Sequence, residues 1–204
     1  MVDLTHHLGT VPSVICNSIG GVGSTFLFDI VDANVPAASP NNFPPGAQQW
    51  KHTIFPPQFR KVRKALFVFG RPDLAVLSIF RRGICSVHLW NKGLPRANLN
   101  LREYIDNGAD VLRTEEHLRN WTTAGSPYPI LCVDHESIFE RKREIIEFFE
   151  LDESILRQFP EEKERSSTLS AVDELGTGYR DRYLDILGGA MRYYEGLDKF
   201  FLLP

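Results

Sequence analysis

Three short apolar runs, each followed by a segment with helical character, constrain the fold of this chain most strongly. The runs lie at Val11–Cys16, Ala65–Phe69 and Tyr128–Val133. Short runs that are largely apolar, without alternation of polar residues, are typical of strands buried on both faces of a parallel sheet. We therefore expect an α/β fold with a central parallel sheet flanked by helices. The 204 residues suffice for one core, so we expect residues 1–204 to form a single domain.

Weaker patterns predict the remaining elements. We expect a short strand at Trp50–Phe55, an irregular segment over 83–100, a helix over Leu101–Trp121 that is broken near Asn107, an amphipathic helix over Ser137–Phe149, and a C-terminal helix over Tyr179–Phe201.

The turn after the first apolar run is rich in glycine. It consists of Gly20, Gly21, Val22, Gly23, Ser24 and Thr25, and leads into the apolar segment Phe26–Val31, which we expect to be helical. Successive glycines let backbone N–H groups converge on an anion, and the helix N-terminus adds partial positive charge. The two hydroxyl side chains add further donors. The turn therefore indicates a phosphate-binding loop, although a tight turn without a ligand also fits these residues.

The loop lacks the cation of a nucleotide-hydrolysing P-loop. A Walker A loop carries Lys directly before its Ser or Thr, and this Lys reaches the β- and γ-phosphates. Here that position is Gly23, and residues 1–50 contain no Lys. ATP or GTP hydrolysis is therefore disfavoured.

With its neighbours, the loop resembles the first motif of the sulfotransferases that use 3′-phosphoadenosine 5′-phosphosulfate (PAPS). That motif is a strand, a loop of the type Pro-Lys-Ser-Gly-Thr-Thr-Trp-Leu, and a helix. The segment Gly20–Leu27 aligns with it without a gap: Gly23, Thr25 and Leu27 are identical, and Ser24 replaces the first Thr. The resemblance implies a P-loop-like sulfotransferase fold in which this loop binds the 5′-phosphosulfate and the aromatic residue Phe26 stacks on the adenine.

The segment Leu66–Ser78 resembles the second motif of the same family, in which a strand is followed by Arg and then by Ser on the next helix. The resemblance implies that Arg71 and Ser78 hold the 3′-phosphate of the cofactor. Arg offers a planar fork of N–H donors to phosphate oxygens, and Ser adds a hydroxyl. The spacing is one residue shorter than the commonest family pattern. A solvent-facing arginine at a strand end is the alternative for Arg71.

Lys51 and His52 are the candidate catalytic residues. Many family members carry Lys-Thr-His between the two motifs, with the His as catalytic base, and Lys51-His52-Thr53 contains the same residues in another order. The ordinary pKa of His suits removal of a proton from a hydroxyl at neutral pH. In a strand, Lys51 and His52 point to opposite faces, so we expect only one of them, His52, to face the site. A solvent-facing histidine is the alternative.

One position departs from the family pattern. The family loop has Lys or Arg where this chain has Gly21, and that cation stabilises the charge that develops during sulfuryl transfer. Lys51 is the nearest candidate to replace it. Three functions therefore stay open: a sulfotransferase acting on a hydroxyl or amine of a small-molecule or glycan acceptor, a non-catalytic nucleotide-binding module of the same fold, and a degenerate P-loop kinase or NTPase relative. We favour the first.

Charge and composition bear on partners. The net charge of −3 argues against a nucleic-acid partner, but eight Lys and Arg residues and one acid, Asp73, lie between Lys51 and Arg82. This local cluster suits a small, highly charged nucleotide. A chain of this length leaves little room for an acceptor site, so a homo-oligomer is a possible arrangement.

Other features bear on compartment and cofactors. The cysteines Cys16, Cys85 and Cys132 are widely spaced, no histidine or cysteine spacing indicates a metal site, and no apolar run approaches the roughly 18 residues of a membrane span. The N-terminus carries no signal-peptide pattern. We expect a cytoplasmic protein without a membrane or metal partner.

Overall fold

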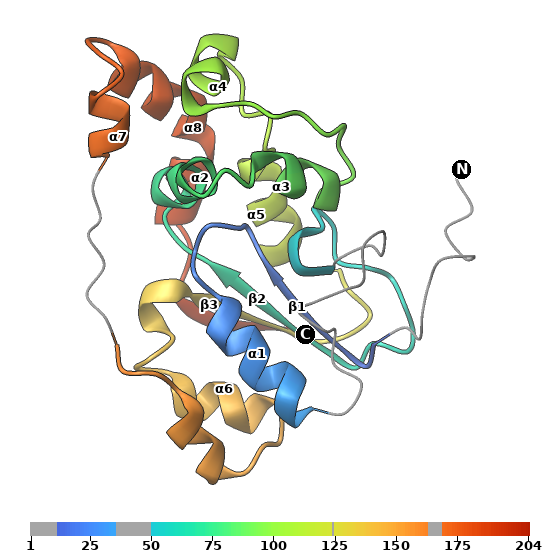
Figure 1. Ribbon diagram of the computed structural model, residues 1–204. Coiled ribbons are helices and arrows are strands. Elements are labelled where there is room, and N and C mark those ends of the chain that lie inside the picture. The colour runs from blue at the N-terminus through green and yellow to red at the C-terminus, as the bar shows by residue number, and fades with distance from the viewer. Residues whose placement is uncertain (1–11, 36–49, 124, 163–168) are drawn as a thin grey trace.

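A four-stranded sheet lies at the centre of the chain (Figure 1). The computed structural model describes residues 12–35, 50–123, 125–162 and 169–204. The strands lie side by side in the order β1-β2-β3-β4, and the first three are parallel whereas the fourth is antiparallel to its neighbour. Their bounds are β1 (Val14–Ser18), β2 (Lys64–Phe69), β3 (Ile130–Asp134) and β4 (Phe200–Leu203).

Helices cover both faces of this sheet. In Figure 1, α1 and α6 lie against one face, and α2, α3, α5 and α8 lie on the other side. The helices are α1 (Thr25–Asn34), α2 (Pro72–Arg81), α3 (Cys85–Asn91), α4 (Leu101–Asn107), α5 (Thr114–Thr122), α6 (Lys142–Phe148), α7 (Ser170–Asp173) and α8 (Tyr179–Glu195). Three short 3₁₀ helices are η2 (Trp50–His52), η3 (His135–Ser137) and η4 (Glu153–Gln158). The expected α/β class, with a central sheet between helices, is confirmed.

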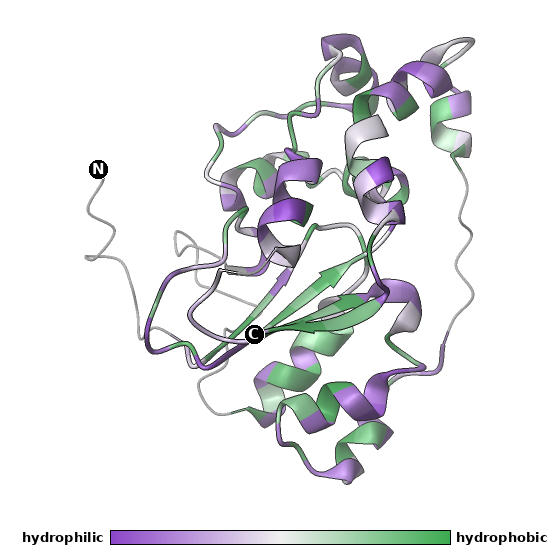
Figure 2. Ribbon diagram, turned by 180° about the vertical axis from the view of Figure 1, so that it is seen from behind, coloured by the Kyte–Doolittle hydropathy of each residue, from purple (hydrophilic) through white to green (hydrophobic). Residues whose placement is uncertain are grey.

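Two apolar clusters form the core. The first joins the strands to α1 and α6, through residues such as Phe28, Phe67, Leu131 and Ile145. The second contains no strand residue and joins α2, α3, α4, α7 and α8. Figure 2 shows the strands as a hydrophobic layer between helices of mixed hydropathy. This pattern explains why the strands are mostly apolar: helices cover the sheet on both sides.

The three predicted buried strands are confirmed as β1, β2 and β3, with ends that differ by a few residues. The expectation of a wholly parallel sheet is wrong in one strand. The predicted C-terminal helix over 179–201 ends at Glu195, and β4 follows as an antiparallel strand. Apolar Phe200–Leu203 reaches β3, where pairing satisfies its backbone groups and those of β3.

The predicted strand at Trp50–Phe55 is also wrong. The segment begins as the 3₁₀ helix η2, and side chains instead of a strand ladder satisfy its backbone. Asn17 Nδ2 and Trp121 Nε1 both donate to the carbonyl oxygen of Thr53, at 3.1 and 2.8 Å. Pro56 and Pro57, which lack an N–H, follow directly and cannot donate to a ladder.

The predictions for three further segments have different outcomes. The segment 83–100, expected to be irregular, contains α3, whose Cys85 and Leu89 are buried in the second cluster. The predicted break near Asn107 is confirmed, because Gly108 ends α4 with a left-handed φ of 71°. The predicted helix over 137–149 is only partly present, as α6 starts at Lys142.

Candidate functional site

β1 runs directly into the glycine loop, and α1 begins at its end. Gly20, Gly21 and Gly23 have φ values of 91°, 70° and 74°, a region that glycine adopts without strain. Ser24 is the N-cap of α1, and its side chain makes no capping hydrogen bond. The first turn of α1 contains no acidic residue that would neutralise the positive end of the helix. The loop therefore presents a helix N-terminus and a hydroxyl to an anion.

Two of these glycines are required by packing as well as by backbone conformation. A Cβ at Gly21 would overlap the backbone carbonyl of Ala75 in α2. A Cβ at Gly20 would overlap Cε1 of His88 in α3 and lie 2.6 Å from its Nδ1. Position 21 therefore has no room for the Lys or Arg that the resemblance places there, and a cation for the loop must come from another segment.

A pocket of about 160 Å³ opens beside the loop. Six predicted site residues line it together: Gly21, Gly23, Ser24, Thr25, Lys51 and His52. The expectation that Lys51 and His52 face opposite sides is wrong, because they lie in a 3₁₀ helix and not in a strand. The sequence motifs point to none of the other lining residues, which are Ser18, Arg82, Ile84, Val87, His88 and Asn91.

A helical pattern could have found most of these missed residues. Ile84, Val87, His88 and Asn91 are spaced as one face of a helix, and α3 places that face along the pocket. Arg82, at the C-cap of α2, adds a second cation to the wall.

Lys51 brings a cation to the loop from η2. Its Nζ donates to Oγ1 of Thr25, the first residue of α1, at 3.1 Å, and lies 5.2 Å from the centre of the Phe28 ring. Burial lowers the pKa of Lys51 below 10.5, and the nearby carboxylate of Asp29 opposes that shift. Lys51 thus stands beside the loop that lacks a cation of its own.

His52 is buried in the same pocket wall. Its Nδ1 lies 2.9 Å from the carbonyl oxygen of Ser18, so Nδ1 carries the proton and donates it. Burial, and after it the neighbouring His88, hold the pKa of His52 well below 6.5. The imidazole is therefore neutral at pH 7, with Nε2 as its acceptor atom, as a base requires.

A chain of buried hydrogen bonds positions η2. His117 Nε2 donates to Asn17 Oδ1 at 2.8 Å, and Asn17 Nδ2 donates to both Oγ1 and the carbonyl oxygen of Thr53 at 3.1 Å. Trp121 Nε1 donates to the same carbonyl. Because Thr53 follows His52 directly, this network ties the position of Lys51 and His52 to β1 and α5.

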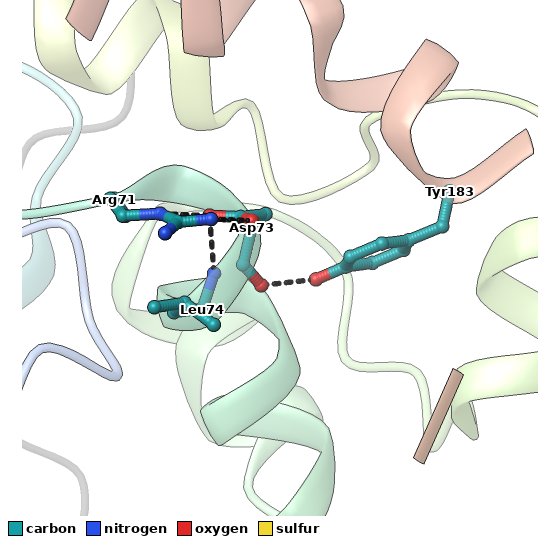
Figure 3. A network of polar contacts seen from close by, with 4 residues as sticks. All are labelled: Arg71, Asp73, Leu74 and Tyr183. Atoms are coloured by element: carbon teal, nitrogen blue, oxygen red, sulfur yellow. Dashed lines mark hydrogen bonds and ion pairs between the residues drawn. The ribbon is translucent and has the colours of Figure 1, made fainter. Parts of the chain in front are cut away.

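Arg71 and Ser78 do not line the pocket. Arg71 is the N-cap of α2, and its NH2 nitrogen lies 2.7 Å from Oδ2 of Asp73, a buried carboxylate (Figure 3). Figure 3 also shows Tyr183 of α8 donating to the backbone carbonyl of Asp73. The side chain of Arg71 is 42% exposed. Ser78 is half-buried within α2.

The strand end that carries Arg71 nevertheless adjoins the loop. A Cβ at Gly70 would lie 3.3 Å from Cγ1 of Val22, so the residue before Arg71 packs on the glycine loop. Val22 is buried and Gly20 packs against His88, and neither residue lines the pocket. Arg71 therefore follows a residue that packs on the loop but lies outside the pocket lining.

Phe26 lies outside the pocket lining. Its ring stacks on Phe139 at 5.5 Å between centroids and meets Phe159 edge-on at 6.2 Å. It is half-buried against the sheet cluster. An adenine would have to use the part of the ring that these contacts leave exposed.

A second hollow, of about 360 Å³, lies between α5 and α8. The charges in its wall pair with one another, Arg113 with Glu116 and Arg119 with Glu115. The pocket at the glycine loop is thus the better anion site.

Over residues 12–35, 50–123, 125–162 and 169–204, no three His, Cys, Asp or Glu side chains group closely enough to hold a metal ion.

Comparisons with protein families, with curated proteins and with solved structures found no match for this chain. Within the part of the chain that the structure describes, no helix is long and apolar enough to cross a membrane.

Proposed function

We propose that this chain is a PAPS-dependent sulfotransferase with the P-loop-like fold of that family. It moves a sulfuryl group to a hydroxyl, or an amine, of a small-molecule or glycan acceptor and leaves adenosine 3′,5′-bisphosphate. One observation carries the proposal: the contact of 3.1 Å between Lys51 Nζ and Thr25 Oγ1 supplies a cation at the glycine loop, where position 21 cannot.

The pocket residues have distinct roles in this proposal. The N-terminus of α1 and the hydroxyls of Ser24 and Thr25 bind the 5′-phosphosulfate. Lys51 stabilises the charge that collects on the oxygen between phosphorus and sulfur as its bond to sulfur breaks. A neutral histidine in the pocket takes the acceptor proton, and His52 is the candidate that the sequence pattern supplies.

The adenosine end of the cofactor lies across the loop from the pocket. Arg71, next to the loop and 42% exposed, and Ser78 hold the 3′-phosphate, and the exposed part of Phe26 contacts the adenine. Asp73 keeps the guanidinium in place in the absence of the nucleotide. The arrangement needs no metal ion, because Lys51 and Arg82 supply the positive charge.

The setting we propose is cytoplasmic, with no nucleic-acid or membrane partner. All three cysteines are buried free thiols, which suits a reducing compartment. Parts of the segments that would shape the acceptor site, residues 36–49 of 32–49 and residues 163–168 of 160–178, lie outside the described residues. A homo-oligomer that completes the acceptor site stays a prediction.

Calorimetry with adenosine 3′,5′-bisphosphate tests the proposal. We expect the wild-type chain to bind it more tightly than ATP with Mg²⁺, and Lys51→Met to weaken binding about 10-fold or more, as for loss of a charged hydrogen bond. Lys61→Met is the matched control, since Lys61 is an exposed lysine of the same basic stretch outside the pocket.

The outcomes separate three functions. Preference for ATP with Mg²⁺ would point to a P-loop kinase or NTPase relative. Binding of the bisphosphate without transfer to any acceptor of a broad panel, using labelled PAPS, would point to a non-catalytic module. No binding at millimolar bisphosphate would rule out the sulfotransferase.

A further inference from the structure

His88 is a buried histidine whose imidazole has no hydrogen bond to any other described residue. It lies on α3, is 2% exposed and belongs to the pocket wall. Its Nδ1 is fully enclosed and without a partner. Burying a polar atom in this way costs about 1–3 kcal/mol unless something pairs with it. An imidazole in the wall of an anion pocket whose buried nitrogen has no such partner is free to change its proton state when a ligand binds.

The glycine loop is shaped to receive this ring. Cε1 and Nδ1 of His88 occupy the space that a side chain at Gly20 would fill. On its other side, the ring packs on His52 at 4.2 Å between centroids with a tilt of 40°. His88 is therefore held between the loop that would carry the sulfuryl donor and the histidine of η2.

The two histidines differ in what their nitrogens can do. In His52, Nδ1 is committed to the carbonyl oxygen of Ser18. In His88, Nδ1 makes no hydrogen bond to another described residue, so its proton state can change without breaking one. This difference favours His88 for a proton transfer.

We propose that His88 is the catalytic base that takes the proton of the acceptor, with His52 as the residue that positions it. This rests on the proposed sulfotransferase function. The acceptor oxygen forms a bond to sulfur while the bond from sulfur to the 5′-phosphate oxygen breaks, and its electron pair stays on that oxygen. The acceptor proton passes to an imidazole nitrogen of His88 and from there to solvent. The products are the sulfate ester and adenosine 3′,5′-bisphosphate.

The charges around His88 make this base dependent on the cofactor. Burial lowers the pKa of His88 to about 3, and Lys92 at the C-cap of α3, Arg82 at the C-cap of α2 and Lys51 of η2 add to the shift, so the free ring is a weak base. His52, the remaining titratable group in contact, is also neutral. A bound anion in the pocket offsets these cations and favours the protonated ring. His88 therefore becomes basic only when the sulfuryl donor is present.

The first test measures the wild-type chain, and a variant serves only to assign one signal. Histidine side-chain nitrogens of the ¹⁵N-labelled wild-type chain are followed by NMR from pH 5 to 9, with and without saturating adenosine 3′,5′-bisphosphate, and His88→Gln assigns the signal. Because the pKa of the free ring is about 3, we expect no titration of His88 between pH 5 and 9 in the free chain and a titration midpoint above pH 5 in the complex. A His88 signal that is unchanged while the bisphosphate is bound would overturn the proposal.

The second test measures release of labelled sulfate from PAPS, with water as acceptor. We expect His88→Asn to bind the bisphosphate within about threefold of wild type and to lose a factor of about 10² to 10⁴ in turnover, together with the acidic limb of the pH–rate profile. His52→Asn keeps that limb. Ser86→Ala, on the same helix but outside the pocket lining, leaves turnover unchanged.

The results distinguish this inference from the function on which it rests. No binding of the bisphosphate by the wild-type chain contradicts both. If the bisphosphate binds normally and His88→Asn keeps its turnover and pH profile, only the role of His88 is overturned. Loss of the acidic limb in His52→Asn, with the limb kept in His88→Asn, has the same consequence. If water gives no measurable turnover, or if His88→Asn does not fold, the NMR titration of the wild-type chain decides.

Discussion

Nζ of Lys51 lies 3.1 Å from Oγ1 of Thr25, so a lysine from η2 completes the positive end of α1. The two residues are 26 positions apart. Hydrogen bonds from Asn17 and Trp121 to the carbonyl oxygen of Thr53, two residues after Lys51, hold the lysine there. This contact replaces a cation that the loop itself has no space to carry.

A lysine at position 21, where the family carries its loop cation, should destabilise the fold. We expect Gly21→Lys to lower the free energy of unfolding by about 3 kcal/mol or more, because the new Cβ would overlap the Ala75 carbonyl and φ is 70°. Urea denaturation measures this. Gly93→Lys is the control: φ is 73°, but nothing lies within 4 Å of its Cβ, so only the conformational strain of about 1 kcal/mol remains. Equal losses at the two sites would contradict the packing argument.

Loosening η2 should weaken the site as well as the fold. Asn17→Leu removes the donor to Thr53 and leaves His117 Nε2 unpaired, at a cost of about 2–4 kcal/mol. We expect lower stability in urea and weaker binding of adenosine 3′,5′-bisphosphate, because Lys51 loses its anchor. Asn98→Leu, at an exposed position, should change neither. If Asn17→Leu is less stable but still binds the bisphosphate normally at urea concentrations below its unfolding transition, the hydrogen-bond network does not position the binding site.

Arg71 should distinguish nucleotides by their 3′-phosphate. We expect Arg71→Ala to reduce affinity for adenosine 3′,5′-bisphosphate by about 10- to 100-fold while affinity for AMP stays the same. Calorimetry with both nucleotides gives the ratio, and Arg60→Ala, at an exposed arginine, is the control. Thermal unfolding is measured in parallel, because the variant leaves the buried Asp73 carboxylate without its guanidinium. A parallel loss for both nucleotides would place Arg71 outside the 3′-phosphate site.

Lys92 should make stability depend on alkaline pH. Burial lowers its pKa to about 8, whereas the unfolded chain keeps a value near 10.5. Between these values the unfolded state binds more protons, so the contribution of Lys92 to stability rises with pH from 8 to 10. The free energy of unfolding of Lys92→Met minus that of wild type should therefore be more favourable at pH 7 than at pH 10, by up to about 3 kcal/mol.

The comparison with Lys92→Met is made by urea denaturation at several pH values. Lys92 also donates to the backbone carbonyl of Leu112 at 2.6 Å, so the variant carries a constant loss from that bond. Only the change of the difference with pH reports the buried ammonium. A difference that is flat from pH 7 to 10 would show that Lys92 titrates as an exposed lysine.

Much of the frame of this fold could be predicted because local pattern decides it. Runs such as Ala65–Phe69 are apolar on every residue, and only a strand covered on both faces buries them all. The glycine loop was predictable for the same reason, since a positive φ at three positions requires glycine. These features depend on residues that are neighbours in the chain.

The pocket depended on contacts between distant residues. Trp50–His52 has the composition of a strand, but Asn17 and Trp121 satisfy Thr53 and leave the segment as a 3₁₀ helix, which brings Lys51 and His52 to one side. Phe200–Leu203 continues a helical pattern, but the edge of β3 pairs with it. His88 has no local signal beyond helical spacing, and its place follows from the packing of α3 on Gly20.

The layered α/β frame and the glycine loop follow from the pattern along the chain, because burial and backbone conformation act on adjacent residues. Contacts between distant segments settle which cation and which histidines meet at that loop. Those side chains come from η2, α2 and α3, and hydrogen bonds and packing across the sheet end, not periodicity along the chain, bring them within reach of one pocket.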